Sequence, residues 1–222
     1  MDIHLNPDST TSAATDKKKE PAKKGALREN VEAILIAIVL ALFIRTFVVQ
    51  AFKIPSGSMK ETLQIGDHIL VNKFIYGVKV PFTGVTAIPF KDPGRGDIVV
   101  FKFPEEPDKD FIKRVVAVAG DRVEIRDKVL FVNDERAGYE QAMFLEPRVI
   151  PASVQPRDNF GPFVLPEDTV FVMGDNRDHS YDSRFWGPVD LQSVRGKAFI
   201  IYWSWNRDDF DVRWGRIGQM LE

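Results

Sequence analysis

The sequence predicts a mainly β protein behind one N-terminal transmembrane helix, and three observations support this fold class. Residues 33–52 form one apolar segment, and a helix of that length rises about 30 Å, which is enough to cross a bilayer. Beyond residue 53, short runs of β-branched and aromatic residues alternate with Gly, Pro, Asp and Asn, as in antiparallel strands. No long stretch of helical period interrupts them.

Composition and charge exclude several classes of function. The chain has 222 residues, a formal net charge of −2 and no cysteine. A charge so close to zero gives no reason to expect nucleic-acid binding. The lack of cysteine excludes a thiol protease, cysteine-held zinc and structural disulfides. The histidines, His4, His68 and His179, do not have metal-ligand spacing, so no metal site is expected.

The flanks of the apolar segment predict its direction in the membrane. Residues 1–30 are polar and rich in lysine, which predicts a disordered tail, and residues 31–52 are expected to be the transmembrane helix. The positive-inside rule places the tail in the cytoplasm and residues 53–222 outside. Arg45 would lie in the outer half of the helix and snorkel to the nearer interface.

A cleaved secretory signal is the alternative interpretation of the same segment. The run 33–44 has the length of an apolar signal core, and Val49-Gln50-Ala51 is a weak cleavage site of small residues. Since the apolar character continues to Phe52, we favour a segment that remains attached.

The external domain is expected to be all-β, either an antiparallel barrel or packed sheets. Residues 121–170 are expected to form a small inserted, non-catalytic subdomain, in which 133–168 are rich in loops. Two of the expected strands flank Asp127-Lys128 and predict a hairpin. The expected strands are residues 69–75, 97–103, 111–118, 122–126, 129–132, 169–173 and 197–202.

Two residues could carry chemistry together. Ser58 lies in Pro55-Ser56-Gly57-Ser58-Met59, just past the apolar segment, although serines beside Pro and Gly are usually turn residues. Lys113 lies within an apolar strand, either solvated at an edge or sheltered by its neighbours. Shelter lowers the pKa of an amine, and a neutral amine can take the proton of a serine hydroxyl.

The loop 174–184 is a third candidate, interpreted either as a polar turn or as support for a site. Ser180 could hold the lysine amine, and Asp182 could pair with Arg184. A triad of Ser58 with His68 or His179 stays open, but the sequence around the serine has no Gly-X-Ser-X-Gly pattern.

Four blocks of sequence, in order behind one apolar segment, resemble the bacterial type I signal peptidases. The resemblance covers residues from about 30 to 200. The blocks are residues 54–59, residues 95–101, residues 113–116 with 120–121, and residues 174–184.

The resemblance implies a Ser/Lys dyad and no cofactor. In it, Ser58 is the nucleophile and Lys113 the general base, and the oxyanion hole is the Ser58 backbone N–H with the Ser56 hydroxyl. Ser180 orients the lysine amine.

The resemblance also implies supporting and pocket residues. Asp182 and Arg184 support the site, while Phe111 and His179 receive no catalytic role. The shallow substrate pockets, which admit small side chains, are lined by Phe52, Ile54, Met59, Leu63, Ile69, Val100 and Ile112.

The expected function is therefore a membrane-anchored serine endopeptidase of the bacterial cytoplasmic membrane. Its partners are the bilayer and the signal peptides of secretory precursors, which it cuts after Ala-X-Ala. Two rivals remain: a Ser/Lys peptidase that cuts itself, and an inactive membrane-tethered β-domain that binds precursors or the export machinery. The aromatic cluster Trp203, Trp205, Phe210 and Trp214 is interpreted as part core and part membrane interface.

Overall fold

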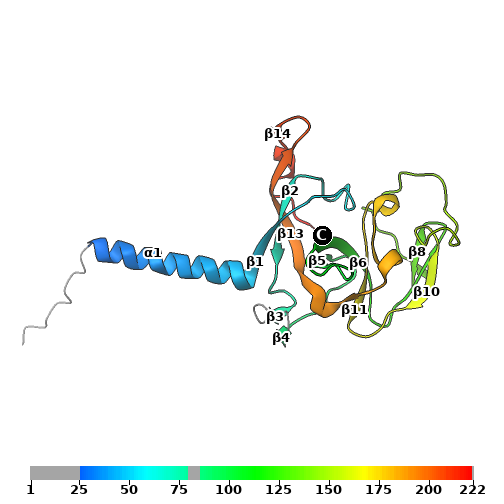
Figure 1. Ribbon diagram of the computed structural model, residues 1–222, viewed down its shortest axis with the longest axis horizontal. Coiled ribbons are helices and arrows are strands. Elements are labelled where there is room, and N and C mark those ends of the chain that lie inside the picture. Colours follow the sequence, from blue (N-terminus) through cyan, green and yellow to red (C-terminus); the bar gives the residue numbers. More distant parts are fainter. Residues whose placement is uncertain (1–25, 80–85, 222) are drawn as a thin grey trace, which may run out of the picture. The chain divides into compact units, whose positions relative to one another are not determined.

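The computed structural model describes residues 26–79 and 86–221 (Figure 1). The chain divides into two compact units between Val39 and Leu40. The first unit is described from Ala26 onward and is helical there; the second, which extends from Leu40, contains all the strands. His4 and most of the tail 1–30 lie outside the described residues.

The prediction of one continuous helix over residues 31–52, after a disordered tail 1–30, is wrong at both ends of the helix. Helix α1 covers Ala26–Phe43, a π-helical turn follows at Ile44–Val48, and strand β1 covers Val49–Lys53. Strand β1 pairs antiparallel with β2, Asp67–Asn72, over its whole length. Pairing with β2 overrides the local apolar pattern here, since Val49 and Phe52 are residue types that fit a strand.

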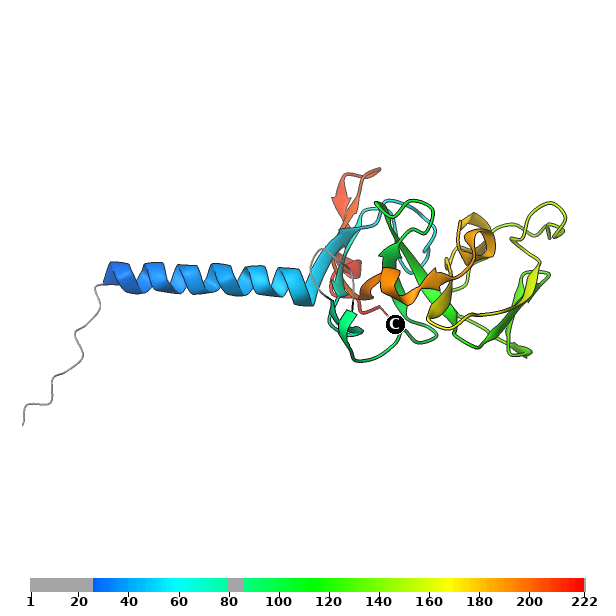
Figure 2. The same ribbon diagram turned by 60° about the horizontal axis from the view of Figure 1, so that its bottom comes forward.

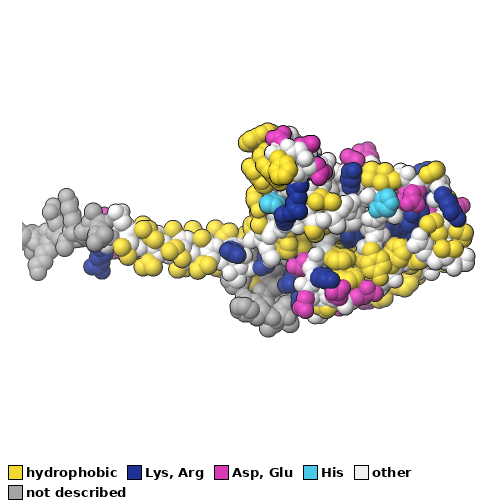
Figure 3. All heavy atoms as spheres, turned by 45° about the horizontal axis from the view of Figure 1, so that its top comes forward, with side chains coloured by type: hydrophobic (Ala, Val, Ile, Leu, Met, Phe, Trp, Pro, Cys, Tyr) yellow, Lys and Arg dark blue, Asp and Glu magenta, His cyan; other side chains and the backbone are white. Residues whose placement is uncertain are grey.

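The exposed surface of α1 is apolar over most of its length (Figure 3). In the part of the chain that the structure describes, no helix combines the length and hydropathy of a membrane span.

The main sheet has eight antiparallel strands in the order β1-β2-β13-β5-β6-β11-β12, with β14 paired to β13. Among the described residues no pairing joins β12 to β1, so the structure has packed sheets and not a closed barrel. The remaining strands of this sheet are β5 (Ile98–Lys102), β6 (Asp110–Val118), β11 (Thr169–Met173), β12 (Val189–Asp190), β13 (Val194–Asn206) and β14 (Asp211–Val212).

The expected insertion forms a second sheet, in the order β10-β7-β8-β9 (Figures 1 and 2). The predicted hairpin is confirmed, since β7 and β8 pair on either side of Asp127-Lys128. Strands β9 and β10 fall in the stretch expected to be loop. The bounds are β7 (Arg122–Arg126), β8 (Val129–Val132), β9 (Glu135–Arg136) and β10 (Phe160–Val164), and the small separate pair is β3 (Gly77–Lys79) and β4 (Thr86–Pro89).

The second sheet shares its hydrophobic core with the main sheet. Val123, Ile125 and Leu130 of the insertion pack in one buried cluster with Val116 and Phe171 of β6 and β11. The insertion therefore packs against β6, which contains Lys113, and against β11, which precedes the loop 174–184. Such a shared core transmits the position of one sheet to the other, because packed interiors are close to incompressible.

The short helices lie in loops, and the C-terminal aromatic side chains are divided between core and surface. Trp203 and Trp205 are half-buried on β13, whereas Phe210 and Trp214 are exposed. The short helices are α2 (Ser183–Trp186) and the 3-10 turns Arg177–His179, Leu191–Ser193 and Trp214–Arg216.

Candidate active site

Ser58 and Lys113 are in direct contact. The Lys113 Nζ donates to Ser58 Oγ at 2.8 Å and to the carbonyl oxygen of Ile112 at 3.0 Å. Lys113 lies in the middle of β6 and is 3% exposed, and Ser58 is 8% exposed. Lys113 is therefore sheltered by its neighbours and not solvated at a sheet edge.

Burial sets the chemistry of this amine. Desolvation lowers the pKa of Lys113 to about 8, with Asp182 and Asp175 opposing the shift and Arg184 adding to it. The Phe111 ring lies with its centroid 5.3 Å from Nζ and helps to enclose it. A large fraction of the amine is consequently neutral near pH 8 and has a lone pair to accept a proton.

The turn around Ser58 supplies two hydrogen-bond donors beside the hydroxyl. Ser56 Oγ lies 3.5 Å from Ser58 Oγ. Within the described residues the backbone N–H of Ser58 makes no hydrogen bond. Both groups are therefore available to a ligand that reaches Ser58 Oγ, as an oxyanion hole requires.

The loop 174–184 holds the carbonyl side of the same turn. The backbone N–H of Asn176 donates to the carbonyl oxygen of Ser58 at 3.1 Å, and its side-chain amide donates to the carbonyl oxygen of Gly57 at 3.2 Å. A Cβ atom at Gly174 would lie 2.4 Å from the Ser58 carbonyl oxygen and 2.3 Å from Ser180 Oγ. Only glycine fits at this crossing, a role that the sequence analysis did not assign to it.

The predicted ion pair of Asp182 and Arg184 is formed and fully buried. Two parallel hydrogen bonds of 2.8 Å join them, and Asp182 also accepts the backbone N–H of Gly174 at 3.0 Å. Burial alone would raise the pKa of Asp182, but Arg184 more than offsets it and the pKa is lowered. This carboxylate is thus a permanent negative charge close to Lys113.

Ser180 lies beside Gly174 and the Asp182 carboxylate, and it also lowers the pKa of Asp182. Its buried Oγ has no regular hydrogen-bond partner among the described residues, so it is not bonded to the Lys113 amine in this structure. Its predicted contact with that amine stays a prediction.

A second buried ion pair, missed by the sequence analysis, ties three segments together. Arg114 donates twice to Asp175, at 2.9 Å in both bonds, and Thr62 Oγ1 donates to the same carboxylate at 2.6 Å. The three residues come from β6, from the loop 174–184 and from the segment after Ser58. The pair Lys113-Arg114 in the sequence is the signal that could have identified this role.

The predicted pocket residues lie together. They form part of one hydrophobic cluster, which also includes Val71, Ile98, Ala198, Ile201 and Leu221. The members that the sequence analysis named are Phe52, Ile54, Met59, Leu63, Ile69, Val100 and Ile112.

His68 and His179 do not approach the serine. His68 faces Tyr202, and His179 lies 3.3 Å from Glu146; neither makes a hydrogen bond to Ser58 in the described structure. Across residues 26–79 and 86–221, no group of three or more His, Asp or Glu side chains is arranged to hold a metal ion. The His triad therefore has no geometry to support it.

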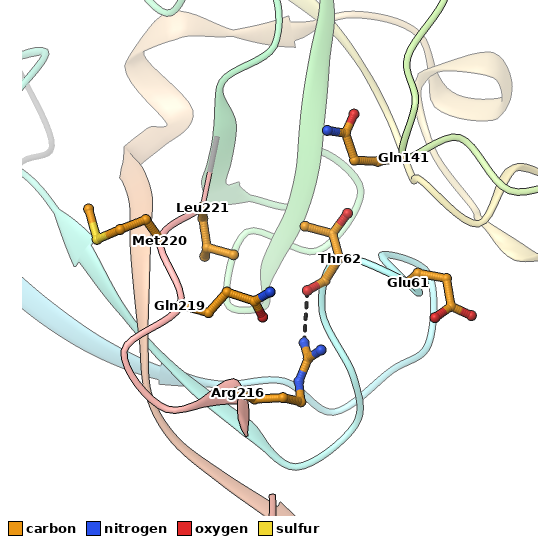
Figure 4. A pocket seen from close by; sticks show the side chains of 7 residues that line it. All are labelled: Glu61, Thr62, Gln141, Arg216, Gln219, Met220 and Leu221. Atoms are coloured by element: carbon orange, nitrogen blue, oxygen red, sulfur yellow. Dashed lines mark hydrogen bonds between the residues drawn. The ribbon is translucent and has the colours of Figure 1, made fainter. Parts of the chain in front are cut away.

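The segment after Ser58 is also held from the C-terminal side (Figure 4). Arg216 donates to the carbonyl oxygen of Thr62 at 2.8 Å and to the buried Asp67 carboxylate at 2.6 Å. A pocket of about 300 Å³ opens between these parts of the chain. It is lined by Glu61, Thr62, Gln141, Arg216, Gln219, Met220 and Leu221.

Comparison with known proteins shows the family of this chain. The sequence profile of the family described as signal peptidase, peptidase S26, matches residues 27–203. The chain belongs to this signal peptidase family. The match includes Ser58, Lys113 and the whole loop 174–184, so every site residue predicted from the sequence lies inside the family region.

Individual signal peptidases are similar over most of their length. Signal peptidase I of Pseudomonas aeruginosa is 37% identical over 213 residues, covering 82% of this chain and 75% of the relative. That of Aquifex aeolicus is 36% identical, with 80% and 85% covered, and that of Leptolyngbya laminosa is 35% identical, with 91% and 92% covered. A crystal structure of signal peptidase I from Enterococcus faecalis is 29% identical, covers 49% of this chain and 97% of its own, and has a TM-score of 0.39.

Proposed function

We propose that this signal peptidase is a membrane-anchored serine endopeptidase with Ser58 as nucleophile and Lys113 as general base. The observation that carries the proposal is the 2.8 Å contact between Ser58 Oγ and a buried amine whose pKa is lowered to about 8. The substrates are secretory precursors, which are cut after the second small residue of an Ala-X-Ala sequence.

The reaction has two halves. Neutral Lys113 takes the proton of Ser58 Oγ as the oxygen attacks the carbonyl carbon of the scissile bond. The tetrahedral intermediate collapses to an ester on Ser58, and the Lys113 ammonium gives its proton to the departing amine. Water then attacks the ester with Lys113 again as base, which releases the signal peptide and restores the serine.

The developing oxyanion is stabilised by the Ser58 backbone N–H and the Ser56 hydroxyl. Both lie beside Ser58 Oγ without another strong partner among the described residues. Each such donor contributes about 3 kcal/mol to the stabilisation of the transition state. Ser180, Asp182 and Arg184 act on this reaction by fixing the position and the surroundings of the lysine amine.

Two free strand edges support binding of the precursor as an added strand. Strand β6 pairs with β11 only from Arg114 to Val118, so the edge of Asp110–Lys113 is unpaired on that side. Strand β1 pairs only with β2 among the described strands. An extended peptide between these edges gains main-chain hydrogen bonds and presents alternate side chains to the hydrophobic cluster that contains Ile54 and Ile112.

We further propose that residues before β1 anchor the enzyme in the bacterial cytoplasmic membrane, with the tail 1–30 inside and the catalytic unit outside. The apolar run 33–44 and the lysines before it support this. The large apolar side chains of α1, such as Ile36 at 62% and Val39 at 66%, are exposed. Anchoring in the bilayer that holds the precursor raises the effective concentration of substrate.

The test is cleavage of a purified precursor bearing Ala-X-Ala, in detergent, by wild type, Ser58→Ala and Lys113→Ala. We expect a cut after the second Ala by wild type and loss of activity in both variants, which should retain the wild-type circular dichroism. Near-wild-type cleavage by Lys113→Ala would show that another group is the base. Inactivity of wild type towards several such precursors would favour a domain that only binds precursors.

A further inference from the structure

One lysine of the inserted sheet reaches the active-site loop. Lys128, in the turn between β7 and β8, donates from Nζ to Asp178 Oδ1 at 2.7 Å and to the carbonyl oxygen of Glu146 at 2.7 Å. The lysine side chain is 11% exposed and the Asp178 side chain is fully buried. This is a shielded ion pair between the second sheet and the loop that carries Ser180.

The backbone at Lys128 is unfavourable for any residue with a Cβ. Asp127 has φ 46° and Lys128 has φ 71°, the left-handed conformation of both central residues in a tight hairpin turn. Glycine is favoured at such positions, and a non-glycine residue there costs roughly 1 kcal/mol. The turn itself has no need of a lysine, so the side-chain contacts of Lys128 explain why this residue occupies it.

Asp178 connects this lysine to residues 143–146 of the insertion. Its Oδ2 accepts the backbone N–H groups of Leu145 and Glu146, both at 2.7 Å. Burial opposes the negative charge of Asp178, but the hydrogen bond from Lys128 and these two N–H groups lower its pKa. The carboxylate thus stays charged and joins Lys128 to the segment 143–146.

The same segment pairs with the residues that hold the serine turn. The Met143 backbone N–H donates to the carbonyl oxygen of Asp175 at 2.7 Å, and the Arg177 backbone N–H donates to the carbonyl oxygen of Met143 at 2.9 Å. Met143 thereby forms an isolated parallel bridge with Asn176. Asn176 is the residue whose backbone N–H binds the carbonyl oxygen of Ser58.

Arg157 provides a second connection from the insertion to the loop. Its guanidinium donates to Asp158 and to Glu146, and its carbonyl oxygen accepts from Arg184 at 2.8 Å. Arg184 in turn binds Asp182 at the site. Besides the backbone bonds of Met143, the insertion therefore contacts the loop at Asp178 and Arg184.

We infer that the inserted sheet positions the catalytic loop, and that Lys128 is the positioning residue through which it acts. The inference rests on the proposed function of Ser58 and Lys113. In this account Lys128 fixes Asp178, Asp178 fixes the segment that pairs with Asn176, and Asn176 fixes the Ser58 turn. The insertion, which the sequence predicted to be non-catalytic, touches no substrate but sets the distance between nucleophile and base.

The decisive variant is Lys128→Gly, because glycine suits the left-handed turn and removes only the side chain. Asp127→Gly is the matched control, since it makes the same backbone change one residue earlier and removes an exposed side chain. We expect Lys128→Gly to lower kcat about tenfold or more with KM within about twofold of wild type, since small misplacements of reacting groups cost this much. Asp127→Gly should keep the wild-type kcat, and Lys128→Arg should recover most of it.

A second readout separates positioning from general stability. A loosened loop admits water to Lys113, so the acid limb of the kcat/KM profile should move to higher pH in Lys128→Gly, a shift that lower stability alone does not produce. If Lys128→Gly unfolds below the assay temperature, Asp178→Asn is measured instead, and the same changes in kcat and pH profile are expected. This substitution removes the negative charge that pairs with Lys128 but keeps an oxygen that accepts from the N–H groups of Leu145 and Glu146.

The outcomes distinguish this inference from the proposed dyad. If Ser58→Ala and Lys113→Ala are inactive while Lys128→Gly keeps the wild-type kcat and pH profile, the positioning role is wrong and the dyad stands. Equal losses in Lys128→Gly and Asp127→Gly also contradict the role, because the backbone change would then be the cause. If Lys113→Ala stays active, the dyad itself is wrong, whatever the result at Lys128.

Discussion

The backbone N–H of Asn176 is bonded to the carbonyl oxygen of Ser58 at 3.1 Å, across 118 residues of sequence (176 minus 58). This bond fixes the reactive turn to the loop 174–184, which contains neither Ser58 nor Lys113. The turn is held in addition by Asp175 through Thr62 and by Arg216. Ser58 therefore depends for its position on residues far away in the sequence.

Gly174→Ala should abolish most of the activity. The new Cβ would lie 2.4 Å from the Ser58 carbonyl oxygen and 2.3 Å from Ser180 Oγ, so the turn and the loop must separate. We expect kcat to fall by about a hundredfold or more, as measured by precursor cleavage. Gly138→Ala is the control, because a Cβ there meets no atom within 4 Å, and its kcat should equal that of wild type.

The rate should rise with pH around the pKa of Lys113. The base is the neutral amine, and its pKa of about 8 means that activity is lost as the pH falls below this value. The pKa of the nearby Asp182 carboxyl is lowered, so this group stays ionised throughout the range. A kcat/KM profile measured from pH 5 to 10 should show the acid limb near pH 8, and a limb near the unperturbed histidine pKa would point to another base.

Lys113→Met should make the protein more stable at pH 7. Burial disfavours the ammonium, and a shift of the pKa from 10.5 to about 8 corresponds to a cost on the order of 3 kcal/mol at pH below 8. In wild type this cost shrinks as the pH rises from 8 to 10.5, because the unfolded chain binds the extra proton there. Thermal midpoints of the two proteins should differ most at pH 7 and converge towards pH 10; equal midpoints at pH 7 would contradict the desolvation of Lys113.

Arg114→Met should strongly destabilise the fold. It leaves the buried Asp175 carboxylate without its ion-pair partner, which costs about 3–5 kcal/mol. Urea titration of the purified protein measures the change. Arg195→Met removes the more exposed partner of Asp110 and should cost at most about 1 kcal/mol; a similar loss in both variants would show that the buried pair has no special role.

Ile112→Ala should widen the range of residues accepted before the cut. Ile112 is 9% exposed and belongs to the hydrophobic cluster that the sequence predicts as pocket wall. Precursors with Val or Leu as the residue before the cut should become substrates, while those with Ala at this position are still cut. Ala137→Gly, in the second hydrophobic cluster, is the control and should leave the preference unchanged.

Local patterns were sufficient to predict much of the fold and to select Ser58 and Lys113 as candidates. The strands β7, β8 and β11 have the predicted ends, because alternation and turn residues mark them clearly. Residue type and motif indicated Ser58 and Lys113 as candidates. The distance of 2.8 Å between Ser58 Oγ and Lys113 Nζ could not be predicted, since it depends on how closely the fold brings β6 to the serine turn.

What escaped prediction depends on contacts between distant segments. Strand β1 looks like the end of an apolar helix until its pairing with β2 is known. Asp175 and Arg114 look like ordinary charged residues until the fold buries them together. Lys128 occupies a turn in which any polar residue is plausible, and only its contact with Asp178 shows why a lysine is present.

The most direct test of the central claim is the site of covalent modification by a serine-directed acylating inhibitor. Intact mass followed by peptide mapping should show one adduct in wild type at pH 8, on the peptide that contains Ser58. The adduct should be absent in Ser58→Ala and should form far more slowly in Lys113→Ala, because the base is lost. An adduct on another residue, or equal rates in wild type and Lys113→Ala, would contradict the assignment of Ser58 and Lys113 as the catalytic dyad.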